Sequence, residues 1–523
     1  MKQRVLYPHA LYSFIILFQP ERVIMSQIKV SHLTFAYDGS YENVFTDVSF
    51  ELDTDWKLGF CGRNGRGKTT FLSLLMGRYQ YNGTISASVG FEYFPYSVGN
   101  TEKNTWDILR TIAPDASLWQ VQRELSKLAV AENALYRSFS TLSNGERTKA
   151  LLAGLFLKEN NFLLIDEPTN HLDMPGRETV ARYLNGKKGF ILVSHDRAFL
   201  DECTDHILSI NRANIDVQNG NFSSWWLNKQ RQDEYELAEN ERLKKDITRL
   251  ETAMRRTAAW SDKAERGKIG IVPGVTEKSK GRRAYEGEKS RKMMARSKTI
   301  QNRQQGSITE KSKLLKNLEF AEELKLRPLV YHTSRLLSVS NLSVAYEETP
   351  VFNGMSFSLH QGERVALMGG NGCGKSSLLK LIYGETIPHD GIVALGSRLI
   401  LSYVPQDTSF LSGSLDDYAN QESIDRTLFR SILRKLDFSR AQFEKNMRDF
   451  SAGQKKKTLL ARSLCQQAHL YVWDEPLNYI DVLSRMQIEA LILAYKPTLL
   501  FVEHDRVFCD HIATKEVTFS HKA

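Results

Sequence analysis

The chain has 523 residues, of which 41% are hydrophobic and 25% charged, with a formal net charge of +9 at pH 7. This composition is typical of a soluble globular protein long enough for several domains, each with its own core. The five cysteines form no C-x-x-C pair, which argues against disulfides, a zinc site or an iron–sulfur cluster and favours a cytoplasmic location. The longest apolar run, Ala10–Phe18, is too short to cross a membrane.

The beginning of the chain resembles a targeting signal only weakly. Lys2 and Arg4 precede the apolar run, but no small-residue cleavage site follows it. Met25 stands directly before a strand-like segment, which favours Met25 as a natural or alternative start. We therefore expect residues 1–24 to be a dispensable extension.

From residue 28 onward the pattern is that of an α/β domain. Two alternating strand-like segments come first, followed by the strand, Gly-rich loop and helix of WKLGFCGRNGRGKTTFLSLLMG. The same series returns later, with an offset of 307 residues from Lys68 to Lys375 and of 309 from His195 to His504. This internal repeat predicts two α/β domains, at 25–224 and 331–523.

Each repeat contains the motif G-x-x-x-x-G-K-[ST] between an apolar strand and a helix. Its glycines turn backbone N–H groups toward phosphate oxygens, its lysine reaches the β/γ-phosphates, and its hydroxyl is a ligand for Mg²⁺. The motif predicts two sites for ATP and Mg²⁺. The residues expected to bind ATP here are Gly62, Arg63, Asn64, Gly65, Arg66, Gly67, Lys68, Thr69 and Thr70, and in the second repeat Gly369, Gly370, Asn371, Gly372, Cys373, Gly374, Lys375, Ser376 and Ser377.

Two further segments of each repeat carry chemistry. The apolar strands FLLIDE and LYVWDE end in two carboxylates, of which Asp166 or Asp474 fits a Mg²⁺ ligand beside Thr69 or Ser376. Glu167 and Glu475 are expected to polarise the attacking water. LSNGE and FSAGQ each supply a hydroxyl and small residues at a helix N-terminus, a second phosphate-binding device. The residues concerned are Ser143, Asn144, Gly145, Ser451, Ala452 and Gly453.

In this order, these motifs resemble ATP-binding-cassette (ABC) ATPases with two nucleotide-binding domains. The resemblance implies that the domains close head to tail, so that each P-loop faces Ser143 or Ser451 of the other domain. It implies adenine stacking on Tyr37 and Tyr346, and a switch histidine at His195 and His504. It also implies that Asp173 and Asp481 lie at the seam between the domains.

One position departs from that family. Gln406 matches the glutamine that helps hold Mg²⁺ and water, whereas the first repeat has Tyr96 there. Tyrosine cannot present an amide, so we expect two hydrolysing sites of unequal rate. The first site is expected to hydrolyse more slowly or to sense the nucleotide differently.

The segment between the repeats has no counterpart in either. Residues 229–327 contain 26 Lys and Arg against 16 Asp and Glu, which suggests a polyanionic partner, nucleic acid or an anionic membrane surface. A solvated helical surface is the plain alternative. We expect a linker at 225–330 whose first helix runs near Trp225–Arg266.

Heptad-like spacing predicts that this linker is an antiparallel helical hairpin, with a tip made by the glycines from Gly267 onward and Pro273. The predicted seam residues are Leu243, Ile247, Leu250 and Met254 on one side and Leu314, Leu318 and Ala321 on the other. The apolar residues predicted at the tip are Ile269, Ile271, Val272 and Val275. A basic shaft of this kind suits a cavity lined by nucleic acid.

Paired cassettes joined by a basic helical linker resemble the ABC-F family of ribosome-binding ATPases. The resemblance implies a monomer whose linker enters the tRNA exit site of the bacterial 70S ribosome and approaches the peptidyl-transferase centre, near 23S rRNA and P-site tRNA. The separation of 74 positions from Thr69 to Ser143 leaves no room for the arm insertion of housekeeping translation factors. With SQIKVSHLTFAYD and DTDWKLGFCGRNGRGKTT, the chain most resembles the Lsa-type resistance group. That likeness implies protection against lincosamides, pleuromutilins and streptogramin A compounds.

Two other functions stay open from the sequence. An ABC-F translation factor without a drug role has the same domain plan, and only the missing arm counts against it. The ATPase subunit of a drug exporter has similar cassettes but no use for a basic rod. A DNA-repair ATPase is disfavoured because the zinc cysteines of such proteins are missing.

Overall fold

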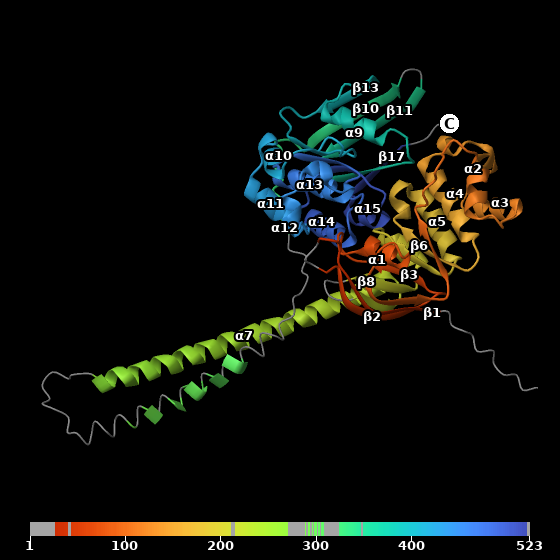
Figure 1. Cartoon of the computed structure of the whole chain (residues 1–523). Coiled ribbons are helices and arrows are strands. Elements are labelled where there is room, and N and C mark those ends of the chain that lie inside the picture. The colour runs from red at the N-terminus through yellow and green to blue at the C-terminus, as the bar shows by residue number, and fades with distance from the viewer. Residues whose placement is uncertain are drawn as a thin grey trace, which may run out of the picture.

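The computed structural model describes residues 27–39, 43–210, 215–269, 324–346 and 349–519, with scattered residues between 288 and 307. Two α/β domains pack against each other, and one long helix projects from them (Figure 1). The predicted fold class of two P-loop domains and a helical linker is confirmed. The expectation about residues 1–24 concerns a segment outside the described residues.

The first domain is built on two β-sheets. Its strands are β1 (Gln27–Phe35), β2 (Phe45–Asp53), β3 (Lys57–Cys61), β4 (Asn82–Ala87), β5 (Gly90–Phe94), β6 (Asn161–Asp166), β7 (Phe190–Val193), β8 (His206–Ile210) and β9 (Ile215–Asn219). An antiparallel sheet has the order β2-β1-β4, and a larger sheet has the order β5-β6-β7-β3-β8-β9. The larger sheet is parallel except for its β8–β9 pair. Strands β6 and β7 are continuous apolar runs because both of their faces are covered.

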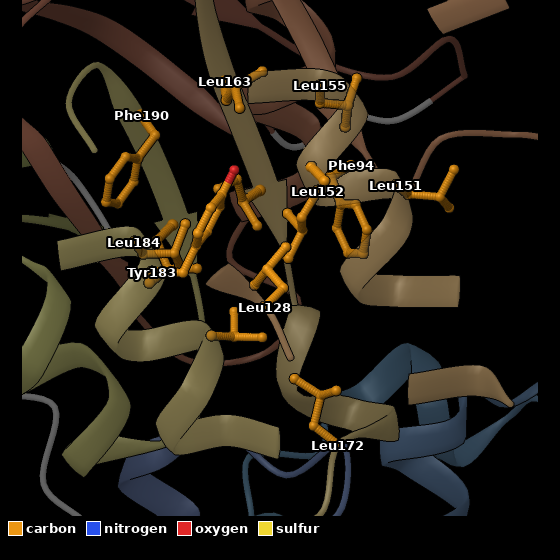
Figure 2. Packing of buried hydrophobic residues seen from close by; sticks show 14 of the residues in the cluster. Phe94, Leu128, Leu151, Leu152, Leu155, Leu163, Leu172, Tyr183, Leu184 and Phe190 are labelled. Carbon is orange, nitrogen blue, oxygen red and sulfur yellow. The ribbon is translucent and has the colours of Figure 1, made fainter. Parts of the chain in front are cut away.

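Helices cover this sheet, and the side chains between the helices and the sheet form a core of the domain. The helices are α1 (Lys68–Leu75), α2 (Thr105–Ile112), α3 (Leu118–Lys127), α4 (Asn144–Phe156), α5 (Met174–Asn185) and α6 (Arg197–Cys203), with short 3-10 turns at Glu132–Tyr136, Phe139–Thr141 and Pro168–His171. Figure 2 shows Leu152 of α4, Leu163 of β6 and Phe190 of β7 within one buried cluster. The cluster fixes α4, and therefore the LSNGE segment at its start, relative to the sheet.

The second domain repeats this plan. Its strands are β10 (Arg335–Tyr346), β11 (Thr349–His360), β12 (Arg364–Met368), β13 (His389–Leu395), β14 (Leu401–Val404), β15 (Leu470–Asp474), β16 (Leu499–Val502) and β17 (Lys515–Thr518). They form sheets of order β11-β10-β13 and β14-β15-β16-β12-β17. The helices are α9 (Lys375–Tyr383), α10 (Leu415–Gln421), α11 (Arg426–Lys435), α12 (Arg440–Phe443), α13 (Ala452–Cys465), α14 (Val482–Tyr495) and α15 (Arg506–Ile512), with a 3-10 turn at Met447–Asp449.

The linker helix α7 (Phe222–Ile269) is longer than the sequence predicts at both ends. Gly267 lies inside it, so the prediction that this glycine begins the tip is wrong. A glycine in the last helical turn costs only about 1 kcal/mol, which the long helix tolerates. Ile271, Val272 and Val275 of the predicted tip, and the seam residues Leu314, Leu318 and Ala321, lie outside the described residues. The predicted seam residues of α7 from Leu243 to Met254 are half-buried, while Lys244 and Lys245 beside them are exposed.

The base of α7 is packed into both domains. Phe222 and Trp225 belong to the same buried cluster as the first-domain core, and Val482 of α14 in the second domain joins it. The linker therefore begins at the seam between the domains, as Figure 1 also shows. In the part of the chain that the structure describes, none of the helices is long and apolar enough to cross a membrane.

Candidate ATP sites between the two domains

Two cavities lie at the seam, and each combines the P-loop of one domain with the signature segment of the other. We call site A the cavity of about 410 Å³ that contains Lys68 and Ser451, and site B the cavity of about 940 Å³ that contains Lys375 and Ser143. Site A is lined by Asn64, Gly65, Lys68, Thr69, Asp166, Glu167, Val193, His195, Asp437, Phe438, Gln442, Ser451, Gly453, Gln454, Lys457 and Tyr479. Site B is lined by Ser143, Asn144, Gly145, Glu146, Lys149, Asn170, Leu172, Asp173, Gly176, Tyr346, Val351, Gly370, Asn371, Gly372, Gly374, Lys375, Ser376, Ser377, Gln406, Glu475 and His504.

The two P-loops have the same backbone form. Gly67 and Gly374 cap α1 and α9 with φ of 94° and 95°, a left-handed conformation that glycine adopts without strain. The Nζ of Lys68 donates to the carbonyl of Gly62 at 2.6 Å, and that of Lys375 to the carbonyl of Gly369 at 2.8 Å. Each ammonium group is thereby held inside its own loop, where a phosphate chain would lie. Burial lowers the pKa of Lys68, against the pull of Asp481 and Glu167.

Asn64 connects site A to the other domain. Its Nδ2 donates to the carbonyl of Tyr479 at 2.9 Å, and its Oδ1 lies 3.1 Å from Nε2 of His195. Gly453 is pressed against the same contact, because a Cβ there would stand 2.5 Å from the Tyr479 carbonyl oxygen. Tyr479 belongs to the same domain as Gly453, and a Cβ there would also stand 3.3 Å from Nδ2 of Asn64 across the seam. The signature glycine therefore leaves room for the Asn64–Tyr479 hydrogen bond.

The acidic end of β6 in site A fits a magnesium ion. Oγ1 of Thr69 lies 3.0 Å from Oδ2 of Asp166. In octahedral coordination at about 2.1 Å, neighbouring oxygen ligands are about 3.0 Å apart, so these two oxygens could ligate one ion. Burial raises the pKa of Asp166, and Tyr93, which donates to it at 2.9 Å, opposes this shift.

In site B, the carboxylate of Asp474 could also take part in binding a magnesium ion. Both carboxylate oxygens of Asp474 are buried, and neither has a hydrogen-bond partner among the described residues. Burial raises the pKa of Asp474 to about 6, against the opposing effects of the Ser376 hydroxyl and of Lys456 and Lys375. A divalent cation would satisfy both carboxylate oxygens, and Ser376 and Gln406 offer further oxygen donors in the same cavity. These oxygens suit Mg²⁺, which would orient the phosphates and neutralise their charge.

The two glutamates that follow these aspartates have different surroundings. Oε2 of Glu475 accepts from Gln406 at 2.8 Å and from Asn478 at 2.5 Å, while its Oε1 lies 3.4 Å from His504. Burial alone would raise its pKa, but His504 and Gln406 bring the pKa of Glu475 below the ordinary value.

Glu167 is held far more loosely. Its Oε1 is buried without a hydrogen-bond partner among the described residues, with Nε2 of His195 at 3.4 Å. Burial, reinforced by Asp166, raises the pKa of Glu167 to about 8. Burial also lowers the pKa of His195, so that ring is neutral. The surroundings thus shift the pKa values of the two glutamates in opposite directions.

The signature segments begin helices with complete capping boxes. The Ser143 hydroxyl accepts from the backbone of Glu146, whose side chain accepts from the Ser143 backbone. Ser451 and Gln454 repeat this arrangement at α13. The caps fix both helix N-termini, and thus their partial positive charge, toward the opposite P-loop.

The remaining predicted residues are placed unequally. Tyr346 lines site B, whereas Tyr37 lies outside the lining of site A, with its ring edge-on to Phe35 at 5.1 Å. Asp173 lines site B and caps α5. Asp481 caps α14 and pairs with Lys457 at 2.7 Å, which holds the pKa of Asp481 well below its usual range. Ile269 is the last residue of α7, and it lines neither cavity.

Comparison with known proteins agrees with this geometry. The family model described as "ABC transporter" matches residues 45–170 and 352–478, so it recognises both halves of the repeat. Each matched range contains one P-loop and one acidic strand end. Both domains are therefore ABC-type ATP-binding domains. The activity of the chain is ATP hydrolysis.

Relatives of this ABC ATPase match it through the linker as well. It is 28% identical to the ribosome protection protein VmlR of Bacillus subtilis, over 93% of this chain and 85% of that protein. It is 27% identical to the energy-dependent translational throttle protein EttA of Haemophilus influenzae, over 90% of this chain and 88% of that one. Similarity to ABC transporter F family member 2 of Arabidopsis thaliana is 26%, over 94% and 76%. The chain therefore has the domain plan of ABC-F proteins.

A solved structure supports the fold alone. An archaeal ribosome recycling factor, aABCE1, determined in complex with the ribosomal stalk protein aP1, has a TM-score of 0.61 to this ABC ATPase. The sequence identity is 17%, and the match covers 94% of this chain and 88% of that chain. The arrangement of two cassettes is thus shared at low sequence identity.

Several site residues of the ABC ATPase escaped the sequence reasoning. Tyr93, which donates to Asp166, has a repeat counterpart in Tyr403, so the internal repeat could have revealed it. Asp437 reaches site A from the end of α11, where no motif marks it. Arg177, which donates to the carbonyl of His504 at 3.1 Å across the seam, matches Arg485 in the repeat.

Tyr96 lies beside site A rather than in it. Its half-buried ring packs on the first-domain core and lines a separate cavity of about 350 Å³ with Phe94 and Glu167. The counterpart Gln406 instead lines site B and donates to Glu475. The departure seen in the sequence thus removes a hydrogen bond from one glutamate only.

Proposed function

We propose that this ABC ATPase binds the bacterial 70S ribosome and protects it from antibiotics of the lincosamide, pleuromutilin and streptogramin A types, as a Lsa-type ABC-F protein would. The observation that carries the proposal is the projecting helix α7 of 48 residues, joined at its base to both ATP-binding domains. A relative aligned over 93% of the chain is named a ribosome protection protein. The protein would be a cytoplasmic monomer.

The charge on the linker supports a polyanionic partner. Arg255 and Arg256 on α7 are exposed, and so are Arg291, Lys292 and Arg296 beyond it. Exposed guanidinium and ammonium groups along a narrow rod suit contacts with phosphates on two sides. We propose that residues 225–330 form a hairpin inserted in the tRNA exit site, with Ile269, Ile271, Val272 and Val275 toward the peptidyl-transferase centre. There they would act through 23S rRNA and P-site tRNA.

ATP would govern residence on the ribosome. We propose domain boundaries at 25–224 and 331–523, with Glu167 and Glu475 positioning the attacking water and His195 and His504 reading the γ-phosphate. Closure of the two domains on ATP at sites A and B would favour the ribosome-bound form, and hydrolysis would release the protein from the ribosome. Thr69, Asp166, Ser376, Gln406 and Asp474 would hold Mg²⁺.

The first test is binding to ribosomes. A variant with both Glu167→Gln and Glu475→Gln should retain ATP and co-sediment with purified 70S ribosomes, and the binding should weaken steeply as salt rises. A matched control carries Lys68→Ala and Lys375→Ala, which removes ATP binding and should leave the pellet empty. Absence of the Gln variant from the ribosomal pellet would contradict both ribosomal hypotheses, protection and translation factor.

A second candidate is an ABC-F translation factor without a drug role, which the similarity to the translational throttle protein favours. Cell-free translation separates the two. Unmutated protein should restore synthesis inhibited by lincomycin, and a variant with serine at positions 269, 271, 272 and 275 should not, while its ATPase activity stays unchanged. Restoration by both proteins would show that the tip is only a turn. The exporter reading would require binding to a membrane partner instead of ribosomes.

A further inference from the structure

Two arginines of the first P-loop face one carboxylate of the second domain. Nη1 of Arg63 and Nη2 of Arg66 each lie 3.6 Å from Oδ1 of Asp437. Arg63 is only 6% exposed. A buried guanidinium without a counterion is strongly unfavourable. The carboxylate of Asp437 therefore stabilises the two arginine side chains in the positions that they occupy here.

The carboxylate is presented by a specific turn at the end of α11. Asp437 has φ of 67°. Its N–H bonds to the carbonyl of Arg434 at 2.9 Å, and the N–H of Phe438 bonds to that of Leu433 at 3.0 Å. Aspartate tolerates this left-handed conformation better than most residues, and the carbonyls at the helix end add negative potential.

The internal repeat provides a comparison within the same molecule. Ala129 ends α3 in the same turn, with φ of 51°, and the N–H of Val130 bonds to the carbonyl of Leu125 at 3.0 Å. The backbone is therefore repeated, but the carboxylate is not. In the second P-loop, Gly370 and Cys373 stand where Arg63 and Arg66 stand in the first. These three positions therefore carry charged side chains at site A and uncharged residues at site B.

The two cavities reflect this difference. Asp437, Phe438 and Gln442 line site A, whereas among the described residues none from 128 to 134 lines site B. Site A is also the smaller cavity, at about 410 Å³ against about 940 Å³. At site A the helical part of the second domain reaches the opposite P-loop.

Arg63 has acidic neighbours on another element as well. It lines a cavity of about 250 Å³ at the base of α7 together with Asp233 and Glu234. Asp233 is already paired with Lys229 at 2.8 Å. Asp437 is the carboxylate that approaches both P-loop arginines from across the seam.

We propose that Asp437 is a positioning residue for ATP hydrolysis at site A: it holds Arg63 and Arg66 by charge, aligns the first P-loop with the opposite domain, and gives site A a closing contact that site B lacks. This inference rests on the ATPase activity and is independent of the ribosomal function proposed above.

The test isolates each site with a glutamate variant. In a Glu475→Gln background, where site A turns over, Asp437→Asn should lower kcat/KM for ATP about fivefold, mainly through KM. In a Glu167→Gln background, where site B turns over, the same change should alter kcat/KM less than about twofold. Asp437→Glu should restore most of the loss. The matched control is Glu444→Gln, which removes one exposed negative charge from the same part of the domain and should change neither site.

A double-mutant cycle distinguishes positioning from a general structural effect. When Arg63→Gln and Arg66→Gln are already present, Asp437→Asn should add no further loss at site A. If Asp437→Asn folds poorly, Asp437→Ala serves instead, because the chain itself has alanine in the equivalent turn at Ala129. Equal effects at both sites, or losses that simply multiply in the triple variant, would overturn the proposal.

Discussion

Arg197 of the first domain donates a hydrogen bond of 2.6 Å from Nη2 to Oε2 of Glu489 in the second domain. Both side chains are about nine-tenths buried, with 9% and 10% of their surface exposed. Oε1 of Glu489 lies 2.5 Å from Nδ1 of His511. This pair joins α6 to α14 across the seam, so the two domains meet through a desolvated charge pair as well as through their candidate ATP sites.

Breaking this pair should weaken the seam. Glu489→Gln leaves Arg197 buried without a counterion, and we expect a loss of about 3 kcal/mol in the free energy of unfolding, measured by urea denaturation. The matched control is Glu178→Gln, whose partner Arg506 lies at 3.2 Å with both side chains more than half exposed. The control should lose less than about 1 kcal/mol. Equal losses would mean that the Arg197 pair is solvated in solution.

Glu167 and Glu475, which we propose to position the attacking water, should contribute unequally to turnover. Glu475 is held by Gln406 and Asn478, whereas Oε1 of Glu167 has no hydrogen-bond partner among the described residues. We therefore expect Glu475→Gln to remove more of the steady-state ATPase activity than Glu167→Gln does, by about tenfold or more. Phosphate release from the two single variants measures this, and equal residual rates would contradict it. Tyr96→Gln should raise the rate of site A in a Glu475→Gln background.

A methyl group on the signature glycine should displace the Tyr479 carbonyl that accepts from Asn64 across site A. The Cβ of Gly453→Ala would meet the Tyr479 carbonyl oxygen at 2.5 Å, a contact that backbone cannot easily relieve. We expect the ATPase rate of site A, measured in a Glu475→Gln background, to fall about tenfold or more. The control Gly99→Ala, where a Cβ meets nothing within 4 Å, should leave the rate unchanged.

Stability of the first domain should depend on pH through Glu124. This buried carboxylate accepts from Lys127 at 2.8 Å, Tyr183 at 2.8 Å and Lys187 at 2.5 Å. Burial alone would raise its pKa, but these donors lower the pKa of Glu124 from 4.5 to about 2. The stabilisation is therefore complete above pH 4.5 and is lost as the pH falls through about 2.

Glu124→Gln tests this linkage. At pH 7 the variant should lose about 2 kcal/mol in the free energy of unfolding, and its difference from the unmutated protein should shrink between pH 4.5 and pH 2. Glu159→Gln, at an exposed position of the same domain, is the control and should change stability by less than about 0.5 kcal/mol. If the difference in unfolding free energy stayed constant down to pH 2, the variant would be destabilised by altered packing and not by the lost charge of Glu124.

The fold was predictable because strong local signals repeat in one order. The P-loops, the acidic strand ends and the apolar strands are contiguous segments, so their period and spacing can be read directly. Asp437 and Arg197 could not be found this way, because each acts on a partner that lies hundreds of residues away and no local pattern marks either. Gly267 was misread because helix propensity is a weak guide when a long helix continues past a single glycine.

Site roles and domain limits remain predictions, although the structure gathers the residues concerned. Tyr37 illustrates why. Its position matches that of Tyr346, yet its ring lies against Phe35 and outside the lining of site A. Both tyrosines point the same way, since Tyr37 bonds through its hydroxyl to Thr70 and Tyr346 to the equivalent Ser377. The two cavities differ in extent, and the larger site B reaches its tyrosine while site A does not.

The apolar contact at the base of α7 has a mechanical consequence. Val482, which lies in the same buried cluster as Phe222 and Trp225, follows directly on Asp481 at the start of α14. A helix of 48 residues is about 70 Å long, so a tilt of about 5° at its base sweeps the far end through about 6 Å. A small tilt of α7 at the seam would therefore be amplified into a displacement of several ångströms at its other end.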